Sequence, residues 1–176
     1  MRTKDLTAGG LLCALTIVLL YMTYLLPHNT LTLLTLASFM VPLALIRSHI
    51  GTAFLVYICS TLLSMFLLPP KIFMMYSFFF GNYGLVKYYI ERLDKPFFEW
   101  VLKFIYFNII LTFGLHTFMT LISPQLFSQL SQIMTQILPN FPLVDRLIFF
   151  LIAQVAFFIF DYALTLLIDT YYRYFP

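Results

Sequence analysis

Five polar residues lie within long apolar stretches of the sequence, where their side chains could bind a small ligand. They are Asn82, Asn108, Thr112, His116 and Gln154. Asn108, Thr112 and His116 are spaced i, i+4, i+8 and would form one stripe on a helix. Amides, a hydroxyl and an imidazole both donate and accept hydrogen bonds, so these residues could line a ligand cavity. The alternative is that they only join neighbouring helices by hydrogen bonds.

Three ionisable residues form a second group, because Lys87, Lys103 and Asp161 also lie inside apolar stretches. If those stretches cross a membrane, a charge at mid-depth costs at least ~2.5–3.5 kcal/mol and needs a partner or a role. Counting about 1.5 Å per helical residue places all three at a similar depth on the inner side. Lys87 or Lys103 could therefore pair with Asp161. The depth favours a structural charge layer, and a proton relay is the alternative.

No pattern in the sequence indicates an enzyme. His116 has no acidic neighbour at helical spacing, so no nucleophile–base pair is visible. Cys13 and Cys59 both lie in apolar runs, which is typical of small buried side chains rather than of a disulfide or a metal site. The net charge of +3 is too small to indicate nucleic-acid binding. We expect a protein without catalytic activity, cofactor, metal or nucleic-acid partner.

The segments that carry these residues have the composition of membrane-spanning helices. The chain has 176 residues, of which 62% are hydrophobic and 10% are charged, whereas soluble domains have about 25% charged residues. Prolines and polar clusters divide it into six stretches of the length that crosses a bilayer. These predicted spans cover about residues 6–26, 30–46, 50–68, 72–90, 97–122 and 144–170. Because the connections are short, we expect one all-α membrane domain over residues 1–176.

The basic residues predict the orientation of the spans, since cytoplasmic connections carry an excess of Lys and Arg. With the N-terminus inside, only Lys71 and Arg146 of the ten basic residues fall on the outer side. We therefore predict that both termini lie in the cytoplasm.

The segment 123–144, between the last two predicted spans, has its own pattern. Leu, Ile and Met recur there at helical spacing, with Gln and Ser on the opposite face. Pro124 lies near the start, where a missing N–H costs least, and Pro139 marks the end. This predicts an amphipathic helix at the outer membrane interface. It would be either a plain connector or a lid over a site that opens outward.

The first predicted span contains small residues at regular spacing. It begins LTAGGLLCAL, in which Gly10 and Ala14 form a small-xxx-small pair, as do Gly9 and Cys13. Such a surface allows another helix to approach closely, either within the bundle or from a partner.

The length, the six spans, the inner termini and the Gly10–Ala14 pair together resemble the substrate-binding S component of energy-coupling factor (ECF) vitamin transporters. The resemblance implies that Gly10 and Ala14 contact a transmembrane coupling subunit and that 123–144 closes over the ligand. It also implies capture of a small water-soluble micronutrient at the outer face of a bacterial cell membrane. Two ATPase subunits would then drive release of the ligand inside the cell.

Two functions of other classes remain open. A membrane scaffold or morphogenesis protein would need no ligand, and its polar residues would only join helices. A small proton-coupled carrier would use Lys87, Lys103 and Asp161, and it would work without an ATPase partner.

Overall fold

The structure, a computed structural model, describes residues 3–93, 95–121 and 142–174. Within these ranges the chain is helical with short connections and contains no strand, as the sequence predicts. In chain order the helices are α1 (Thr3–Leu25), η1 (Pro27–Asn29), α2 (Thr30–Ser38), α3 (Met40–Arg47), α4 (Ile50–Leu67), α5 (Pro70–Met75), η2 (Tyr76–Phe80), α6 (Gly81–Glu91), α7 (Pro96–Leu121) and α9 (Pro142–Tyr174).

Among the described residues, five helical stretches are long and apolar enough to cross a membrane. They are Thr3–Leu25, Pro27–Arg47, Ile50–Leu67, Pro96–Gly114 and Phe150–Arg173. Large apolar side chains such as Leu11, Ile109 and Ile159 point outward on them and are 61–65% exposed. A broad apolar surface of this kind suits lipid tails rather than water. The fold is therefore that of a multi-pass helical membrane protein.

The second predicted span, 30–46, is divided into α2 and α3 at Phe39. Pro42 accounts for the break, because it has no N–H to bond the carbonyl group of Ser38, four residues earlier. Its ring also crowds that carbonyl group. The two pieces still follow one another closely enough that Pro27–Arg47 counts as one candidate span.

The fourth predicted span, 72–90, is helical from Pro70 to Glu91 but is made of three pieces, and it is not among the five candidates. Its middle piece, η2, is a π-helix. In α6, a Cβ atom added to Gly84 would lie 2.7 Å from Cγ of Pro42. Glycine is therefore required where α6 packs against Pro42 of α3.

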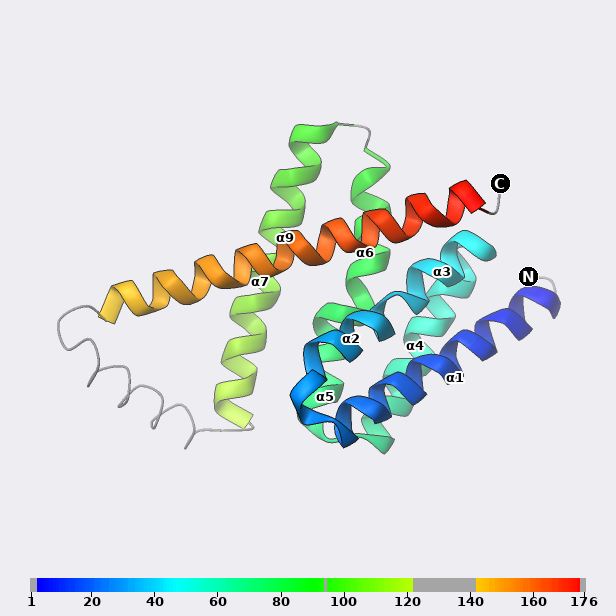
Figure 1. The fold of residues 1–176 in the computed structure, drawn as a ribbon, viewed down its shortest axis with the longest axis horizontal. Coiled ribbons are helices and arrows are strands. Elements are labelled where there is room, and N and C mark those ends of the chain that lie inside the picture. The colour runs from blue at the N-terminus through cyan, green and yellow to red at the C-terminus, as the bar shows by residue number, and fades with distance from the viewer. Residues whose placement is uncertain (1–2, 94, 122–141, 175–176) are drawn as a thin grey trace.

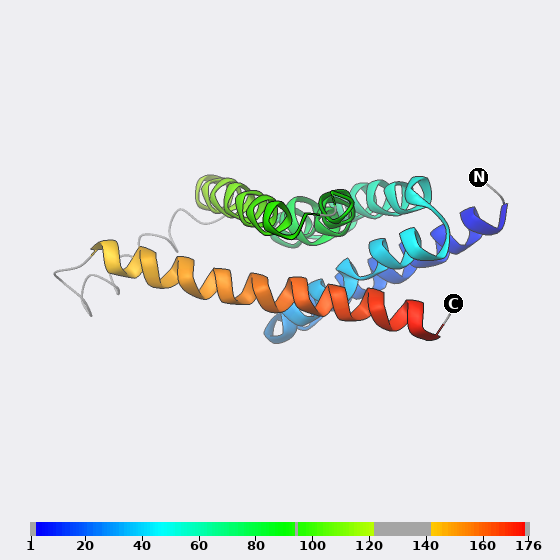
Figure 2. The same ribbon diagram turned by 90° about the horizontal axis from the view of Figure 1, so that it is seen from above.

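The helices pack in two layers around apolar cores. Figure 2 shows α4, α6 and α7 on one side, while α9 crosses on the other side. One core cluster gathers around Tyr76, Tyr83 and Phe107. A second cluster, which includes Leu12, Val41, Val56 and their neighbours, lies between α1, α3 and α4. The first cluster joins α9 to the rest of the bundle through Phe157, Phe160 and Leu164.

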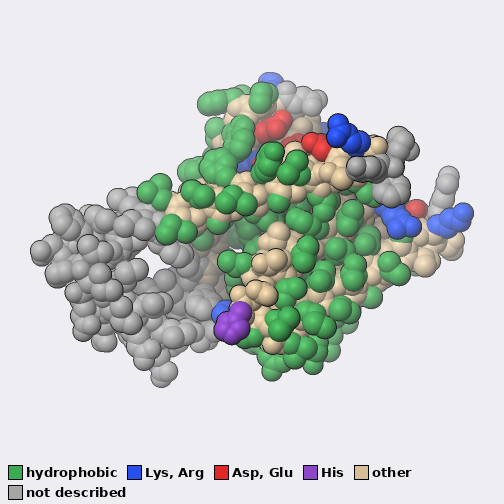
Figure 3. Space-filling view, viewed as in Figure 1, with side chains coloured by type: hydrophobic (Ala, Val, Ile, Leu, Met, Phe, Trp, Pro, Cys, Tyr) green, Lys and Arg blue, Asp and Glu red, His purple; other side chains and the backbone are tan. Residues whose placement is uncertain are grey.

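The two ends of the described chain lie on the same side of the molecule. The start of α1 and the end of α9 are both at the right in Figure 1, and the turn between α6 and α7 is at the top. Lys and Arg side chains gather along these upper and right edges in Figure 3, beside a largely hydrophobic surface. The predicted interfacial helix at 123–144 falls almost wholly on residues 122–141, outside the described residues, and α9 begins at Pro142.

Candidate functional site

The predicted inner charge layer forms one connected ion-pair network. Nζ of Lys87 in α6 lies 2.5 Å from Oδ1 of Asp161 in α9, and Nζ of Lys103 in α7 lies 3.3 Å from Oδ2 of the same carboxylate. Glu91, one turn after Lys87, lies 2.9 Å from Lys87 and 2.7 Å from Lys103. Two positive and two negative side chains therefore neutralise each other where three helices meet.

Burial explains why this network must be complete. The side chain of Lys87 is 1% exposed, and those of Lys103 and Asp161 are 7% and 8% exposed. Tyr83 donates a 2.6 Å hydrogen bond to Oδ1 of Asp161, and Lys87 also donates to the hydroxyl oxygen of Thr165 at 2.8 Å. Buried charges are tolerated when they are paired and their remaining hydrogen-bonding groups are satisfied. The network thus joins α6, α7 and α9, and Lys87 and Asp161 are fully engaged within it.

Three members of the network, Tyr83, Glu91 and Thr165, were not predicted from the sequence to belong to the charge layer. Helical spacing was the available signal, because Tyr83 and Glu91 lie four residues before and after Lys87. Thr165 likewise follows Asp161 by four residues and donates to its carbonyl oxygen at 3.0 Å.

The predicted ligand-binding residues are only partly brought together. Nε2 of Gln154 donates a 3.0 Å hydrogen bond to Oδ1 of Asn108, which joins α9 to α7. Asn82 donates to the hydroxyl oxygen of Tyr106 at 3.3 Å, and Thr112 donates to the carbonyl oxygen of Asn108 in its own helix. The side chain of His116 lies outside the described residues. Among the described groups, the buried Oε1 of Gln154 has no hydrogen-bond partner.

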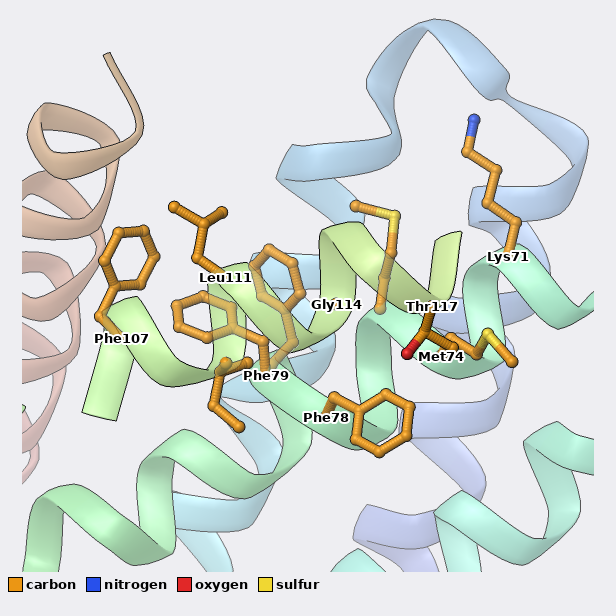
Figure 4. Close-up of a pocket in the computed structure, with 11 residues that line it drawn as sticks. Lys71, Met74, Phe78, Phe79, Phe107, Leu111, Gly114 and Thr117 are labelled. Carbon is orange, nitrogen blue, oxygen red and sulfur yellow. The ribbon is translucent and has the colours of Figure 1, made fainter. Parts of the chain in front are cut away.

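A separate cavity of about 330 Å³ lies between the α5–η2 run and α7. Phe107 and Leu111 lie at one end, and Lys71 lies at the other end (Figure 4). The five predicted polar residues are absent from its described lining. The lining residues are Lys71, Met74, Met75, Phe78, Phe79, Phe80, Phe107, Ile110, Leu111, Gly114 and Thr117.

The small residues of α1 divide between an inner and an outer face. Gly9 and Cys13 are buried, and a Cβ atom on Gly9 would lie 2.9 Å from Cγ2 of Thr52 in α4. Gly10 and Ala14 are exposed, and a Cβ atom on Gly10 would meet no other described atom within 4 Å. The Gly9–Cys13 pair therefore packs within the bundle, whereas the Gly10–Ala14 pair faces outward.

The geometry thus defines a multi-pass helical membrane protein with a buried charge network, an apolar cavity and an outward-facing small-residue surface. Comparison with protein-family models, curated proteins and solved structures found no match.

Proposed function

We propose that the chain is the membrane-embedded ligand-binding subunit of an ATP-driven uptake system for a small micronutrient, of the ECF S-component type. The cavity between α5, η2 and α7 carries this proposal. Its volume of about 330 Å³ falls within the range of small-molecule sites, about 300–1,000 Å³. The α5 end of the bundle lies away from both termini in Figure 1, so it would face outward if the termini are cytoplasmic.

The proposal includes six spans in a bacterial cell membrane, with both termini inside. The unbroken helical run from Pro70 to Glu91 would be the fourth span, with Lys71 at its outer end and Arg92 just after its inner end. The other five spans are the apolar stretches already described. The excess of Lys and Arg on one side supports this orientation.

The Gly10–Ala14 surface would contact a transmembrane coupling subunit, to which two ATPase subunits bind. Both residues are exposed, and no described side chain of the bundle fills the space beside Gly10. A partner helix could therefore approach the backbone of α1 closely at this point.

One observation favours the scaffold alternative. Asn108 and Gln154 bond to each other, as interhelical contacts do, and they do not line the cavity. A scaffold would need neither the cavity nor an ATPase, so the two functions differ in what the protein binds.

Affinity purification from the native membrane tests the proposal. The tagged wild-type protein should carry a membrane coupling subunit and two ATPase subunits, identified by mass spectrometry. Gly10→Leu should reduce their recovery at least about tenfold, because the new side chain fills the surface that the partner helix needs. The substitution meets no described atom at Cβ, and leucine is a better helix former than glycine.

Gly114→Leu is the matched control, since Gly114 also has no described atom within 4 Å of an added Cβ but lies in the cavity lining. It should retain the partners and lose ligand uptake. A wild-type protein that purifies repeatedly without any ATPase, from cells whose shape depends on it, would contradict the transporter proposal and support the scaffold.

A further inference from the structure

We propose that the cavity between α5, η2 and α7 binds a single-chain anionic amphiphile, such as a fatty-acid carboxylate. The apolar chain would lie between the α5–η2 run and α7, and the anionic group would lie beside Lys71. This assigns to the cavity a substrate class that is more apolar than the water-soluble micronutrient implied by the resemblance, and it rests on the proposed function for its role in uptake. Binding itself can be measured without any partner subunit.

The shape of the cavity suits an extended chain. Its lining comes from one face of α7, where Phe107, Ile110, Gly114 and Thr117 recur at helical spacing. Ten residues of helix separate Phe107 from Thr117, which gives a length of about 15 Å. On the facing α5–η2 run, Met74 and Phe78 form part of the opposite wall.

The chemistry of the described lining favours an apolar ligand body over a polar one. Apart from Lys71 and Thr117, every described side chain that lines the cavity is apolar or a glycine. The hydroxyl group of Thr117 donates to the carbonyl oxygen of Phe113 at 2.8 Å, so it is not a free donor. A ring with several polar atoms would lose its hydrogen bonds to water here without replacement. Met and Phe side chains instead adapt well to a flexible apolar chain.

The positive charge of Lys71 favours a ligand with an anionic group. Its side chain is exposed at the end of the cavity opposite Phe107 (Figure 4). Among the described residues, no carboxylate forms an ion pair with Lys71, whereas Lys87 and Lys103 each have two such partners. Lys71 is also one of the two basic residues that the predicted orientation places outside. A carboxylate at the head of the ligand would complement this charge.

Photocrosslinking in nanodiscs of phosphatidylcholine tests the proposal. The probe is a dodecanoate that carries a diazirine in its chain, and labelled peptides are mapped by mass spectrometry. Labelling should concentrate on the cavity residues Met74, Phe78 and Ile110 and should be displaced by unlabelled dodecanoate. Equal labelling of Phe66, which is 82% exposed on the lipid-facing surface, would overturn the proposal.

Two variants and one matched control test separately how the cavity binds the apolar chain of the ligand and its anionic group. Gly114→Leu should reduce labelling at least about tenfold, because its side chain occupies the cavity without a clash at Cβ. Lys71→Gln should weaken competition by dodecanoate about fivefold and leave competition by dodecanol unchanged. Gly10→Leu should label as the wild type does. Labelling that is insensitive to Gly114→Leu would overturn the proposal.

A second probe distinguishes a membrane lipid from a free carboxylate. A diazirine-bearing phosphatidylglycerol should label the cavity at least about tenfold less than the dodecanoate probe, and stronger labelling by the phospholipid would overturn the single-chain assignment. Loss of cavity labelling with the ATPase partners retained would refute this inference alone. Cavity labelling without any ATPase partner would refute the proposed function alone.

Discussion

Asp161 of α9 accepts hydrogen bonds from Tyr83 and Lys87 of α6 and from Lys103 of α7. Its side chain is 8% exposed, so these contacts are shielded from solvent. The pairing joins α9 to the consecutive helices α6 and α7, whose lysines lie 74 and 58 residues before Asp161 in the sequence. A buried ion pair adds little net stability over apolar packing, but removal of one partner leaves an uncompensated charge. We therefore expect the network to specify which helices meet and the stability of the fold to depend on its completeness.

Replacement of the central carboxylate should destabilise the protein strongly. Asp161→Asn leaves Lys87 and Lys103 with only the carboxylate of Glu91 between them. We expect the free energy of unfolding to fall by about 3 kcal/mol, because one buried positive charge is no longer neutralised. Denaturant-induced unfolding in detergent micelles measures this change. Asp169→Asn, at an exposed position of the same helix, is the control and should have little effect.

The double variant Lys87→Met with Asp161→Leu tests whether removal of a whole ion pair destabilises the protein less than removal of one charge. It removes one positive and one negative charge and retains the 2.7 Å pair of Lys103 with Glu91. Stability should recover only in part, by about 1–2 kcal/mol relative to Asp161→Asn, because removal of a whole buried pair leaves no uncompensated charge but the buried hydroxyl group of Tyr83 loses its acceptor. A double variant as unstable as Asp161→Asn would show that the network contributes more than charge neutralisation.

The charge network was largely predictable, whereas the environment of the other polar residues was not. Depth along a helix follows from counting residues, so Lys87, Lys103 and Asp161 could be placed in one layer. Which face of a helix points into the bundle depends on the rotation of the helix about its own axis. Counting residues does not give that rotation. Asn82 therefore meets Tyr106 rather than the pair formed by Asn108 and Gln154.

The π-helical segment η2 shows how tertiary contacts change a helix. A π-turn departs from the regular hydrogen-bond ladder and frees backbone carbonyl groups for other donors. Tyr57 of α4 donates to the carbonyl oxygen of Ser77 at 2.9 Å, and Tyr106 of α7 donates to that of Phe78 at 3.4 Å. Two neighbouring helices thus supply donors to the segment that forms one wall of the cavity.

Loss of one donor should destabilise this wall. Tyr57→Phe keeps the ring and removes the hydroxyl group, so the carbonyl oxygen of Ser77 loses its side-chain partner. We expect the free energy of unfolding to fall by about 1 kcal/mol, with faster amide hydrogen exchange over Tyr76–Phe80. Tyr89→Phe, at a position that is 59% exposed, should change neither quantity. Unchanged exchange in Tyr57→Phe would mean that this hydroxyl does not support the π-helix.

Neither the break at Phe39 nor the π-helix was predicted from the sequence, although the break has a local cause. The break at Phe39 follows from Pro42 by a local steric rule, although the sequence alone suggested an unbroken span. The π-helix has no such local signal, because YSFFF contains neither proline nor glycine. Phe79 stacks on Tyr83 and contacts the rings of Phe107 and Phe160. The π-helix therefore packs against side chains of α6, α7 and α9, which the local sequence does not reveal.

The basic edge of the molecule and the Lys71 end of the cavity lie at opposite ends of the bundle. The start of α1, the turn between α6 and α7 and the end of α9 lie along the upper and right edges of the bundle, where basic side chains gather. The cavity reaches the opposite end of the α5–η2–α6 run, at Lys71. A membrane that separates these two ends would place the cavity and the basic edge on different sides.

Site-directed labelling with a membrane-impermeant maleimide tests this orientation together with the proposed fourth span. In a background in which Cys13 and Cys59 are replaced by Ala, Lys71→Cys should react only from outside, and Arg92→Cys only from the cytoplasmic side. Because Lys71 and Arg92 flank a single helical run, opposite labelling would show that residues 70–91 cross the membrane. Arg173→Cys should react from the same side as Arg92→Cys. If Lys71→Cys and Arg92→Cys react from one side, then 70–91 does not span, and the cavity cannot connect the outer face with an inner partner.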